Sequence, residues 1–281
     1  MTKTIDTLVE DIYSLFGSGI EFDQEIAKFF GDAMAKTVSS RVPSVKTDGN
    51  LRMSNVGSAC LRKLWYTCNL PHTEAEEMPK STLMKFLYGD IIEEVVLYLA
   101  AEAGHRVEGM QDELEINGVK GHRDAVIDGV LVDVKSASTY SFKKFTSHLT
   151  QDQDAFGYIP QLQQYLYASQ DDPLVTDKDR AAFLVVDKTL GHICLDVHGK
   201  DGVDYGRYVN QTKTAVASDN VPSRGYPTEE DGKSGNEKLG VNCSYCEWKH
   251  KCYPGLRTFL YSGGPRFLTK VARVPDVHEV T

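Results

Sequence analysis

Residues 121–135 read GHRDAVIDGVLVDVK, and this stretch predicts a β-hairpin. Asp128-Gly129 is a dipeptide favoured in two-residue type I′ turns, because both central residues of that turn need a positive φ angle. If these two residues form the loop, Ile127 pairs with Val130. Valine then recurs at every second position from 130 to 134, so one face of the second strand is directed towards a core and the register is specific.

The same register places two carboxylates side by side. Asp124 comes opposite Asp133, and directly opposed residues have Cβ atoms about 4.5–5.5 Å apart, where like charges are destabilising. A fold retains such a pair when a positive charge lies between them, and a hard divalent cation with oxygen ligands suits that position. Lys135 projects from the same face as Asp133. This group indicates chemistry on a phosphate; the alternatives are an ordinary exposed strand face, or a longer loop that separates the carboxylates.

Composition limits the class of protein. The 281 residues are 41% hydrophobic and 25% charged, which permits one large globular domain or one and a half. The first residues lack a signal-type apolar run, and no apolar stretch reaches 18 residues, so we expect a soluble, cytoplasmic protein without a membrane partner. The net charge of −9 argues against non-specific coating of nucleic acid, but it leaves a local basic groove open.

The six cysteines are unevenly placed. Cys243, Cys246 and Cys252 form a C-x2-C-x5-C cluster, and Cys60 stands far upstream. In a reducing compartment such a cluster indicates a metal site, and four thiolates suit either structural zinc or an iron–sulfur cluster. Cys68 is an alternative fourth ligand. Cys194 is expected in a strand as a small buried hydrophobe.

Apolar spacing and turn residues predict the order of elements. We expect helices at 5–16, 23–37, near 58, 81–103, 139–147, 160–169 and 203–217. We expect strands at 105–109, 112–117, 119–127, 130–137, 181–187 and 192–197, with connections at 39–55 and 218–240. This order predicts an α/β or α+β fold with a central mixed β-sheet flanked by helices.

Two helices carry further polar groups. Glu93 lies in the long helix four residues after Gly89 and is a candidate third carboxylate. Gln161 and Tyr165 are four residues apart on one helix face and suit a nucleotide or a phosphate. Taken alone, Glu93 is explained better as part of a solvated helix face. Gln161 and Tyr165 alone are explained better as a half-buried polar stripe beside core residues.

Together these motifs resemble the PD-(D/E)XK nuclease superfamily, in particular its RecB-like branch with an iron–sulfur cluster, which includes CRISPR adaptation nucleases. The resemblance covers residues 58–255 and departs from the family at Glu93, where many members have His. The ordered motifs are Cys60 with Arg62 and Leu64-Trp65-Tyr66, Gly89 with Glu93, Gly121 with Asp124, Asp133 with Lys135, Gln161 with Tyr165, and the three terminal cysteines.

The resemblance implies a restriction-endonuclease-like core in residues 56–255, preceded by a helical region at 1–55 and followed by a tail at 256–281. It implies that Glu93, Asp124, Asp133 and the Val134 carbonyl bind Mg²⁺ or Mn²⁺, and that Lys135 positions water or stabilises developing charge. Gln161 and Tyr165 would hold the substrate strand or steady the site. Cys60, Cys243, Cys246 and Cys252 would carry a [4Fe–4S] cluster that joins the N- and C-terminal parts, with zinc as the alternative.

The implied activity is metal-dependent hydrolysis of DNA, as an exonuclease on ends or single strands in recombination, repair or DNA processing. DNA and recombination or helicase proteins would be the partners. Two other hypotheses stay open: a DNA-binding module without catalysis, and a redox protein that uses the cluster.

Overall fold

The computed structural model describes residues 3–42 and 49–280. Contacts between residues group the chain into two compact units, which we describe separately. The first unit contains residues 3–42, 52–57 and 79–209, and the second contains 49–51, 58–78 and 210–280. The sequence predicts three consecutive regions, at 1–55, 56–255 and 256–281, and this division stays a prediction. Each of the two units instead combines several separate stretches of the chain.

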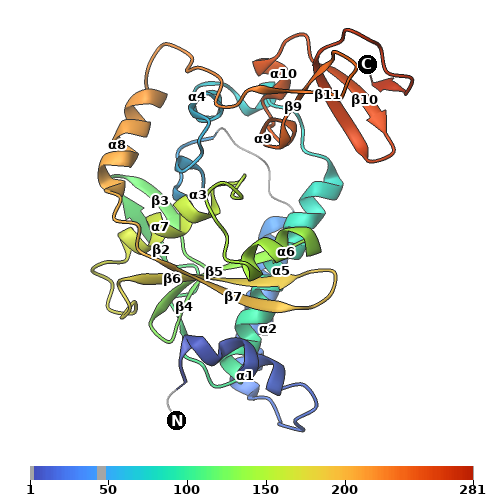
Figure 1. Ribbon diagram of the computed structural model, residues 1–281. Helices are drawn as coiled ribbons and strands as arrows, with labels where there is room; N and C mark the ends of the chain where they lie inside the picture. Colours follow the sequence, from blue (N-terminus) through green and yellow to red (C-terminus); the bar gives the residue numbers. More distant parts are fainter. Residues whose placement is uncertain (1–2, 43–48, 281) are drawn as a thin grey trace. The chain divides into compact units, whose positions relative to one another are not determined.

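The first unit is built on a mixed sheet with helices on both faces (Figure 1). Its helical segments are η1 (Ile5–Thr7), α1 (Leu8–Ser14), α2 (Gln24–Arg41), α3 (Met53–Val56), α5 (Lys80–Glu102), α6 (Thr139–Thr146), α7 (Tyr158–Ala168) and the start of α8 (Tyr205–Val216). Its strands are β1 (Val107–Glu108), β2 (Glu113–Ile116), β3 (Val119–His122), β4 (Ala125–Ile127), β5 (Val130–Ala137), β6 (Arg180–Asp187) and β7 (Ile193–Gly199).

Among the described residues, the main sheet of this unit has the order β1-β4-β5-β6-β7, and β2 and β3 form a separate two-stranded ribbon. The pair β5–β6 is parallel, and the remaining pairs of the main sheet are antiparallel. A parallel pair needs a crossover connection, and here α6 and α7 lie between the two strands in sequence. The expected fold class, a mixed sheet with helices, is confirmed.

The predicted hairpin turn is confirmed. Asp128 has φ 51° and Gly129 has φ 85°, as a type I′ turn requires. Ile127 pairs with Val130. The carbonyl of Gly129 accepts hydrogen bonds from the backbone N–H groups of Thr176 (2.9 Å) and Asp177 (3.0 Å), which hold the turn against the rest of the unit.

The single strand expected at 119–127 is wrong, because the chain changes sheet at Arg123. This arginine is 2% exposed. Its guanidinium pairs with Asp112 at 2.7 Å and with Asp172, and it donates to the Gly109 carbonyl at 3.0 Å. The buried ion pairs therefore interrupt the extended chain between β3 and β4.

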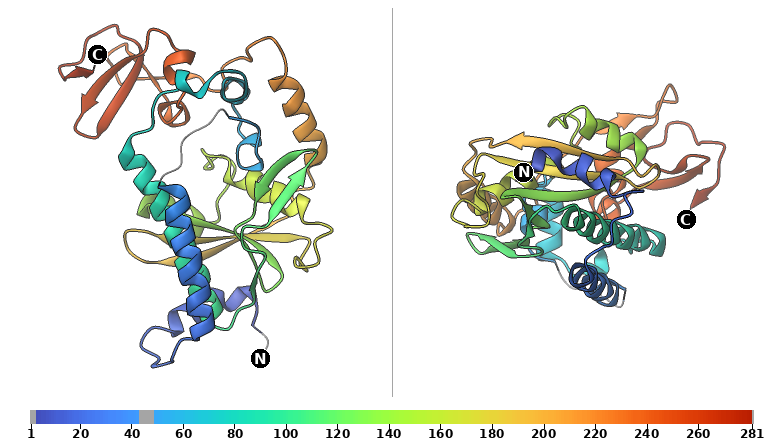
Figure 2. Two further views of the ribbon diagram at one scale, coloured as in Figure 1. Left: turned by 180° about the vertical axis from the view of Figure 1, so that it is seen from behind. Right: turned by 90° about the horizontal axis from the view of Figure 1, so that it is seen from below.

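The two faces of the sheet are covered by different helices. Val130, Val132 and Val134 pack with α1 and α5 in one hydrophobic core. On the other face, the Phe183 ring contacts Phe145 of α6 with the ring centroids 5.4 Å apart. Helix α2 packs on the outside of α5, and the right-hand view of Figure 2 shows these two helices next to each other.

The predicted bounds of the long helix are confirmed. Helix α5 ends at Glu102, and Gly104 follows with φ 85°, as expected of a glycine just beyond a helix. The connection expected at 39–55 is partly wrong, because α2 continues to Arg41 and Met53–Val56 forms α3. Residues 43–48 of that connection lie outside the described residues.

The second unit contains short helices and an antiparallel sheet. Its elements are the end of α8, α4 (Leu61–Asn69), η2 (His72–Glu74), α9 (Val241–Ser244), α10 (Lys249–Cys252), β8 (Thr228–Glu230), β9 (Glu237–Leu239), β10 (Arg257–Tyr261), β11 (Gly264–Lys270) and β12 (Glu279–Val280). The described strands have the order β12-β10-β11-β9-β8. The loop expected at 218–240 and the tail at 256–281 therefore contain strands, and Phe259 and Leu268 are fully buried.

No helix in the part of the chain that the structure describes is long and apolar enough to cross a membrane.

Candidate active site

Asp124 and Asp133 are neighbours across the hairpin, as the sequence predicts. The pairing of Ala125 with Val132 places Asp124 one residue outside β4 and opposite Asp133. The Asp124 carboxylate accepts a hydrogen bond from the backbone N–H of Val134 at 2.7 Å, which fixes its direction. Asp133 is 3% exposed, so its carboxylate has lost most of its contact with water. The role expected for the Val134 carbonyl stays a prediction.

Lys135 lies beside this pair. Its ammonium is 2.5 Å from Oδ2 of Asp133 and 5.0 Å from the centre of the Tyr158 ring. Burial lowers the pKa of Lys135, but Asp133 and Asp124 raise it by more, so the net shift is upward. The side chain is therefore an ammonium at every physiological pH.

Glu93 reaches the same cluster from helix α5. Its carboxylate accepts a hydrogen bond from the Gln111 amide at 2.7 Å. Burial raises the pKa of Glu93 from its usual 4.5 to about 7, and the negative charge of Asp133 contributes in the same direction. The third carboxylate expected from the sequence is therefore an electrostatic neighbour of the first two.

The carboxylate cluster lacks enough positive charge. Burial raises the pKa of Asp124 well above its usual value, with further contributions from Asp133 and Glu93. Burial also raises the pKa of Asp133, although Lys135 opposes this shift. Since a bound cation would reverse these shifts, the donor set fits a hard divalent ion. In the described chain the three carboxylates do not offer oxygens that all lie within 4.8 Å of one another, so binding one ion requires side-chain movements.

Helix α7 brings the two expected polar residues to the cluster. Tyr165 is 4% exposed and is hydrogen-bonded to Gln161. Burial raises the pKa of Tyr165 to about 12, and Asp133 and Asp124 add to the shift. A side chain at Gly121 would put its Cβ 3.0 Å from the Tyr165 hydroxyl oxygen. Glycine at this motif position therefore allows the tyrosine to approach the hairpin.

The sequence analysis missed Tyr158, which lies against the Lys135 ammonium. The signal was available, because Tyr158, Gln161 and Tyr165 are spaced by three and four residues and share one helix face. Asp154 orients this helix: its carboxylate accepts hydrogen bonds from three successive backbone N–H groups, those of residues 157, 158 and 159, at 2.8–2.9 Å.

The four expected cysteine ligands gather in the second unit. Burial raises the pKa of the Cys243 thiol to about 11, and the thiols of Cys246, Cys60 and Cys252 add to this shift. A Cβ at Gly225 would lie 2.8 Å from Cβ of Cys60. A backbone without a side chain therefore packs directly against this upstream cysteine.

The spacing of these thiols bears on the kind of group they fit. Zinc with four thiolates at about 2.3 Å requires sulfurs less than about 4 Å apart. In the described chain no three of the four sulfurs lie within 4.8 Å of one another, so a zinc ion, like one ion at the carboxylates, would require side-chain movements. Burial raises the pKa of Cys68, the alternative ligand. Cys194 lies in β7 of the other unit, in a strand as expected, but it is half-buried and not buried as the sequence predicts.

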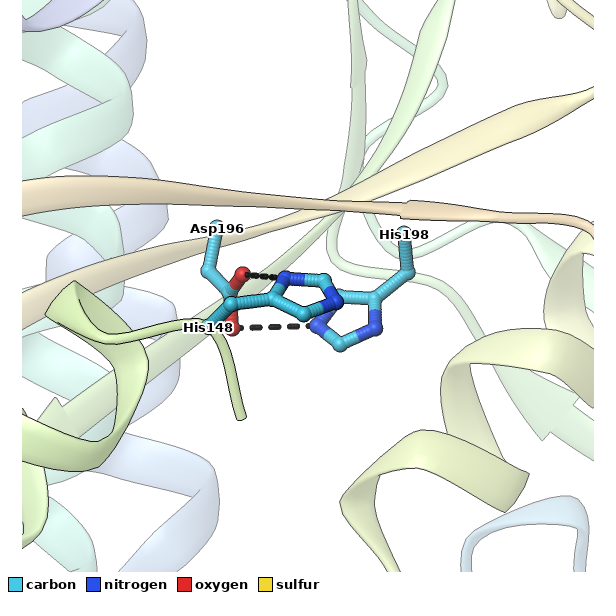
Figure 3. Close-up of side chains that lie close together, drawn as sticks. All are labelled: His148, Asp196 and His198. Atoms are coloured by element: carbon cyan, nitrogen blue, oxygen red, sulfur yellow. Dashed lines mark hydrogen bonds and ion pairs between the residues drawn. The ribbon is translucent and has the colours of Figure 1, made fainter. Parts of the chain in front are cut away.

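A third cluster was not expected from the sequence. His148, Asp196 and His198 of the first unit point towards one another (Figure 3), and their ligand atoms all lie within 4.8 Å of one another. Asp196 and His198 are two residues apart in a strand and so share a face, which is a usable signal. His148 is far away in sequence and gives no such signal.

Comparisons with known proteins assign no family. A scan against protein-family models finds no match, and a search of curated proteins finds none either. Among solved structures, one described as "Crystal structure of SSO0001" is similar, with 16% sequence identity and a TM-score of 0.44 over 79% of this chain and 93% of that chain. This similarity carries no argument about activity.

Proposed function

We propose that the chain is a metal-dependent nuclease that hydrolyses phosphodiester bonds of DNA. One observation carries the proposal: Asp124 and Asp133 are opposed on a rigid hairpin, and the Lys135 ammonium lies 2.5 Å from Asp133. Glu93 lies on helix α5, and the negative charge of Asp133 contributes to its raised pKa. Several neighbouring carboxylates with raised pKa values favour a cation-binding role, because a bound cation would compensate their negative charge.

The residues of the cluster have separable roles in this mechanism. Glu93, Asp124 and Asp133 would hold Mg²⁺ or Mn²⁺, with the Val134 carbonyl as a further oxygen donor. When bound, such an ion neutralises phosphate charge and lowers the pKa of its water. Lys135 orients the attacking water or balances the charge that develops on the phosphate oxygens.

Two tyrosines of helix α7 also contribute to the site: Tyr165 offers a phenol proton, and Tyr158 lies against the Lys135 ammonium. Gln161 is hydrogen-bonded to the Tyr165 phenol, and we expect the phenol proton to be donated to a substrate oxygen. With a pKa of about 12, Tyr165 keeps that proton at neutral pH. The Tyr158 ring limits the directions that the Lys135 ammonium can take.

Exposed rings in the same unit support a single strand or a frayed end as substrate. Tyr140 is 77% exposed and Phe156 is 56% exposed. The Lys144 ammonium lies 5.6 Å from the centre of the Tyr140 ring. Exposed rings beside cations are the usual platform for unpaired bases. We also propose a cytoplasmic location, with recombination or helicase proteins as partners.

For the cysteines we propose a [4Fe–4S] cluster with a structural role, held by Cys60, Cys243, Cys246 and Cys252. One observation supports a shared group: the thiols of Cys60, Cys246 and Cys252 lie close enough to Cys243 to raise its pKa. Zinc is the alternative. Iron and sulfide analysis together with the visible absorption of anaerobically purified protein separates the two.

The test of the activity is incubation with end-labelled single- and double-stranded DNA in Mg²⁺, Mn²⁺ or EDTA. We expect cleavage with either ion and none with EDTA. Asp133→Asn and Lys135→Ala should each lower the cleavage rate by at least roughly 10²-fold.

Matched controls come from the surface of the same unit. Asp171 and Lys188 are exposed, so Asp171→Asn and Lys188→Ala should cleave normally. DNA binding without cleavage under all ionic conditions would instead support the non-catalytic DNA-binding module. Full activity of both Asp133→Asn and Lys135→Ala would exclude this site.

A further inference from the structure

A second group of metal-ligating side chains lies apart from the proposed nuclease carboxylates. Nδ1 of His148 is 2.8 Å from Oδ1 of Asp196, and Nε2 of His198 is 3.0 Å from Oδ2 of the same carboxylate (Figure 3). The two imidazole rings are stacked, with centroids 4.4 Å apart. One carboxylate thus gathers two imidazoles from different elements.

These separations suit a shared metal ion. Nitrogen and oxygen ligands bind zinc at about 2.0–2.2 Å, so two neighbouring ligands of one tetrahedral ion lie about 3.3–3.6 Å apart. The observed separations are a few tenths of an ångström shorter, and the three ligand atoms lie within 4.8 Å of one another. An ion replacing the hydrogen bonds therefore requires only a small outward rotation.

The surroundings hold two of the ligands and leave the third accessible. The side chains of Asp196 and His198 are 2% and 7% exposed. The Leu149 backbone N–H donates to Oδ2 of Asp196 at 3.0 Å, and the Phe183 ring packs against His198. The His148 side chain is 60% exposed, so ions and water reach the cluster from that side.

Sheet register separates this group from the nuclease carboxylates. Asp133 pairs with Phe183, and Phe183 pairs with Asp196. The three residues therefore form one row on one sheet face, with Asp133 and Asp196 roughly 10 Å apart at about 4.8 Å per strand. Strand β6 with Phe183 therefore lies between the strands that carry the two carboxylates, and this separates the two groups.

We propose that His148, Asp196 and His198 form a separate site for a divalent first-row transition ion such as Zn²⁺. Two imidazoles with one carboxylate select such ions over Mg²⁺, which prefers oxygen ligands. The ion ties the segment between α6 and α7, which carries His148, to strand β7. Three protein ligands leave a coordination position for water on the exposed side.

The test is Zn²⁺ titration by calorimetry in excess Mg²⁺, with the iron and zinc content of the cysteines measured beforehand. His148→Asn is the informative variant, because His148 has φ 64° and asparagine tolerates this backbone conformation. We expect the stoichiometry to fall by one ion per chain in His148→Asn. It should not fall in His192→Ala, which removes another exposed histidine of the same unit.

Two further measurements identify the donors. Asp133→Asn should retain the Zn²⁺ equivalent, because the site does not depend on the nuclease carboxylates. Co²⁺ in place of Zn²⁺ should bind without the strong near-ultraviolet absorption that thiolate ligands give. Equal stoichiometry in the wild-type chain and His148→Asn, or loss of the equivalent only in Asp133→Asn, would overturn the proposal and leave the cluster as a hydrogen-bonded structural group.

Discussion

At the scale of single residues, the carboxylate cluster is a place where function opposes stability. Asp124 is surrounded by the negative charges of Asp133 and Glu93, and its pKa is well above its usual value, chiefly because it is buried. The substitution Asp124→Asn would keep an oxygen that accepts from the Val134 N–H but would carry no charge. The site therefore retains a repulsion that a simple substitution removes.

We predict that Asp124→Asn raises the free energy of unfolding of the metal-free chain by roughly 0.5–2 kcal/mol at neutral pH. The same variant should lose the stabilisation that Mg²⁺ gives to the wild-type chain, because a ligand that binds the folded state shifts the unfolding equilibrium. Urea denaturation with and without Mg²⁺ measures both effects. Destabilisation without metal, or stabilisation by Mg²⁺ as in the wild type, would contradict the cation-binding role.

Glu93 gives the cluster a pH dependence. Its pKa in the folded chain is about 7, against 4.5 for an ordinary glutamate. Between these values the folded chain keeps a proton that the unfolded chain has released, so the free energy of unfolding falls as pH rises through this window. We predict a fall on the order of 3 kcal/mol from this residue in metal-free protein.

Denaturation at about pH 5 and about pH 8 measures this slope, and Glu93→Gln should reduce it. Mg²⁺ should also reduce it, because the bound ion favours the charged carboxylate. A slope that Glu93→Gln leaves unchanged would show that other carboxylates cause it.

Residues of the site could be predicted where local spacing determines contact. Asp124, Asp133 and Lys135 lie on one hairpin, so turn chemistry and a period of two were sufficient. Tyr158 was available from helix spacing and was overlooked. His148 could not be found, because its contact with Asp196 depends on how α6 packs on the sheet, which no local pattern encodes.

At the scale of elements, the β4–β5 turn determines the register on which the site depends. Gly129 has φ 85°, and a Cβ there would collide with the Thr176 side chain. Gly191 provides a matched comparison: it has φ 73° but nothing within 4 Å of a built Cβ. Substituting Gly191 by alanine therefore tests backbone strain alone, whereas substituting Gly129 tests backbone strain together with steric conflict.

We predict that Gly191→Ala costs about 1–2 kcal/mol of stability from backbone strain alone. Gly129→Ala should cost a further amount of roughly 1–3 kcal/mol, because Thr176 must move. It should also weaken Mg²⁺ binding, since a displaced turn separates the opposed carboxylates. Thermal unfolding and Mg²⁺ titration of both variants check this. If the two substitutions lower the stability equally, the Thr176 side chain moves aside without a measurable cost, and the predicted steric conflict is wrong.

Elements were predictable where apolar periodicity is strong, as in α5 and in the strands flanking Asp128-Gly129. Strands β8 and β9 of the second unit were missed because each has only three residues, two of them charged. Ser262-Gly263 nonetheless connects Tyr261 and Gly264, which pair across a two-residue turn, and such a dipeptide is a hairpin signal. Phe259 and Leu268 are buried and have apolar neighbours in β10 and β11, so these two strands also carried an apolar signal.

At the scale of the whole molecule, the three proposed metal centres are divided between the two units, and the site of His148, Asp196 and His198 lies in the first unit. The carboxylates lie in the first unit, and the four cysteines lie in the second. The chain's two tryptophans, Trp65 and Trp248, are both in the second unit. The Trp248 indole donates to Thr67 at 3.1 Å and is 2% exposed. Tryptophan fluorescence therefore reports unfolding of the unit that contains the cysteines.

The second unit has a reason to depend on its cysteines. Cys60 immediately precedes helix α4. Cys243 lies in α9, Cys246 in the short segment that follows it, and Cys252 at the end of α10. A group bound to all four connects chain segments that are about 180 residues apart in sequence. Closing so long a loop restricts the unfolded chain, which stabilises the folded unit.

We predict that Cys246→Ala lowers the midpoint of the fluorescence-detected melting transition by about 5 °C or more. Cys68→Ala removes a half-buried thiol outside the proposed ligand set and should shift the midpoint less. Mg²⁺ binding at the carboxylates should be unchanged in both variants, because the carboxylates belong to the other unit. If Cys246→Ala melts as the wild type does, the four thiols do not connect these segments, and the proposed structural role of the cluster is wrong.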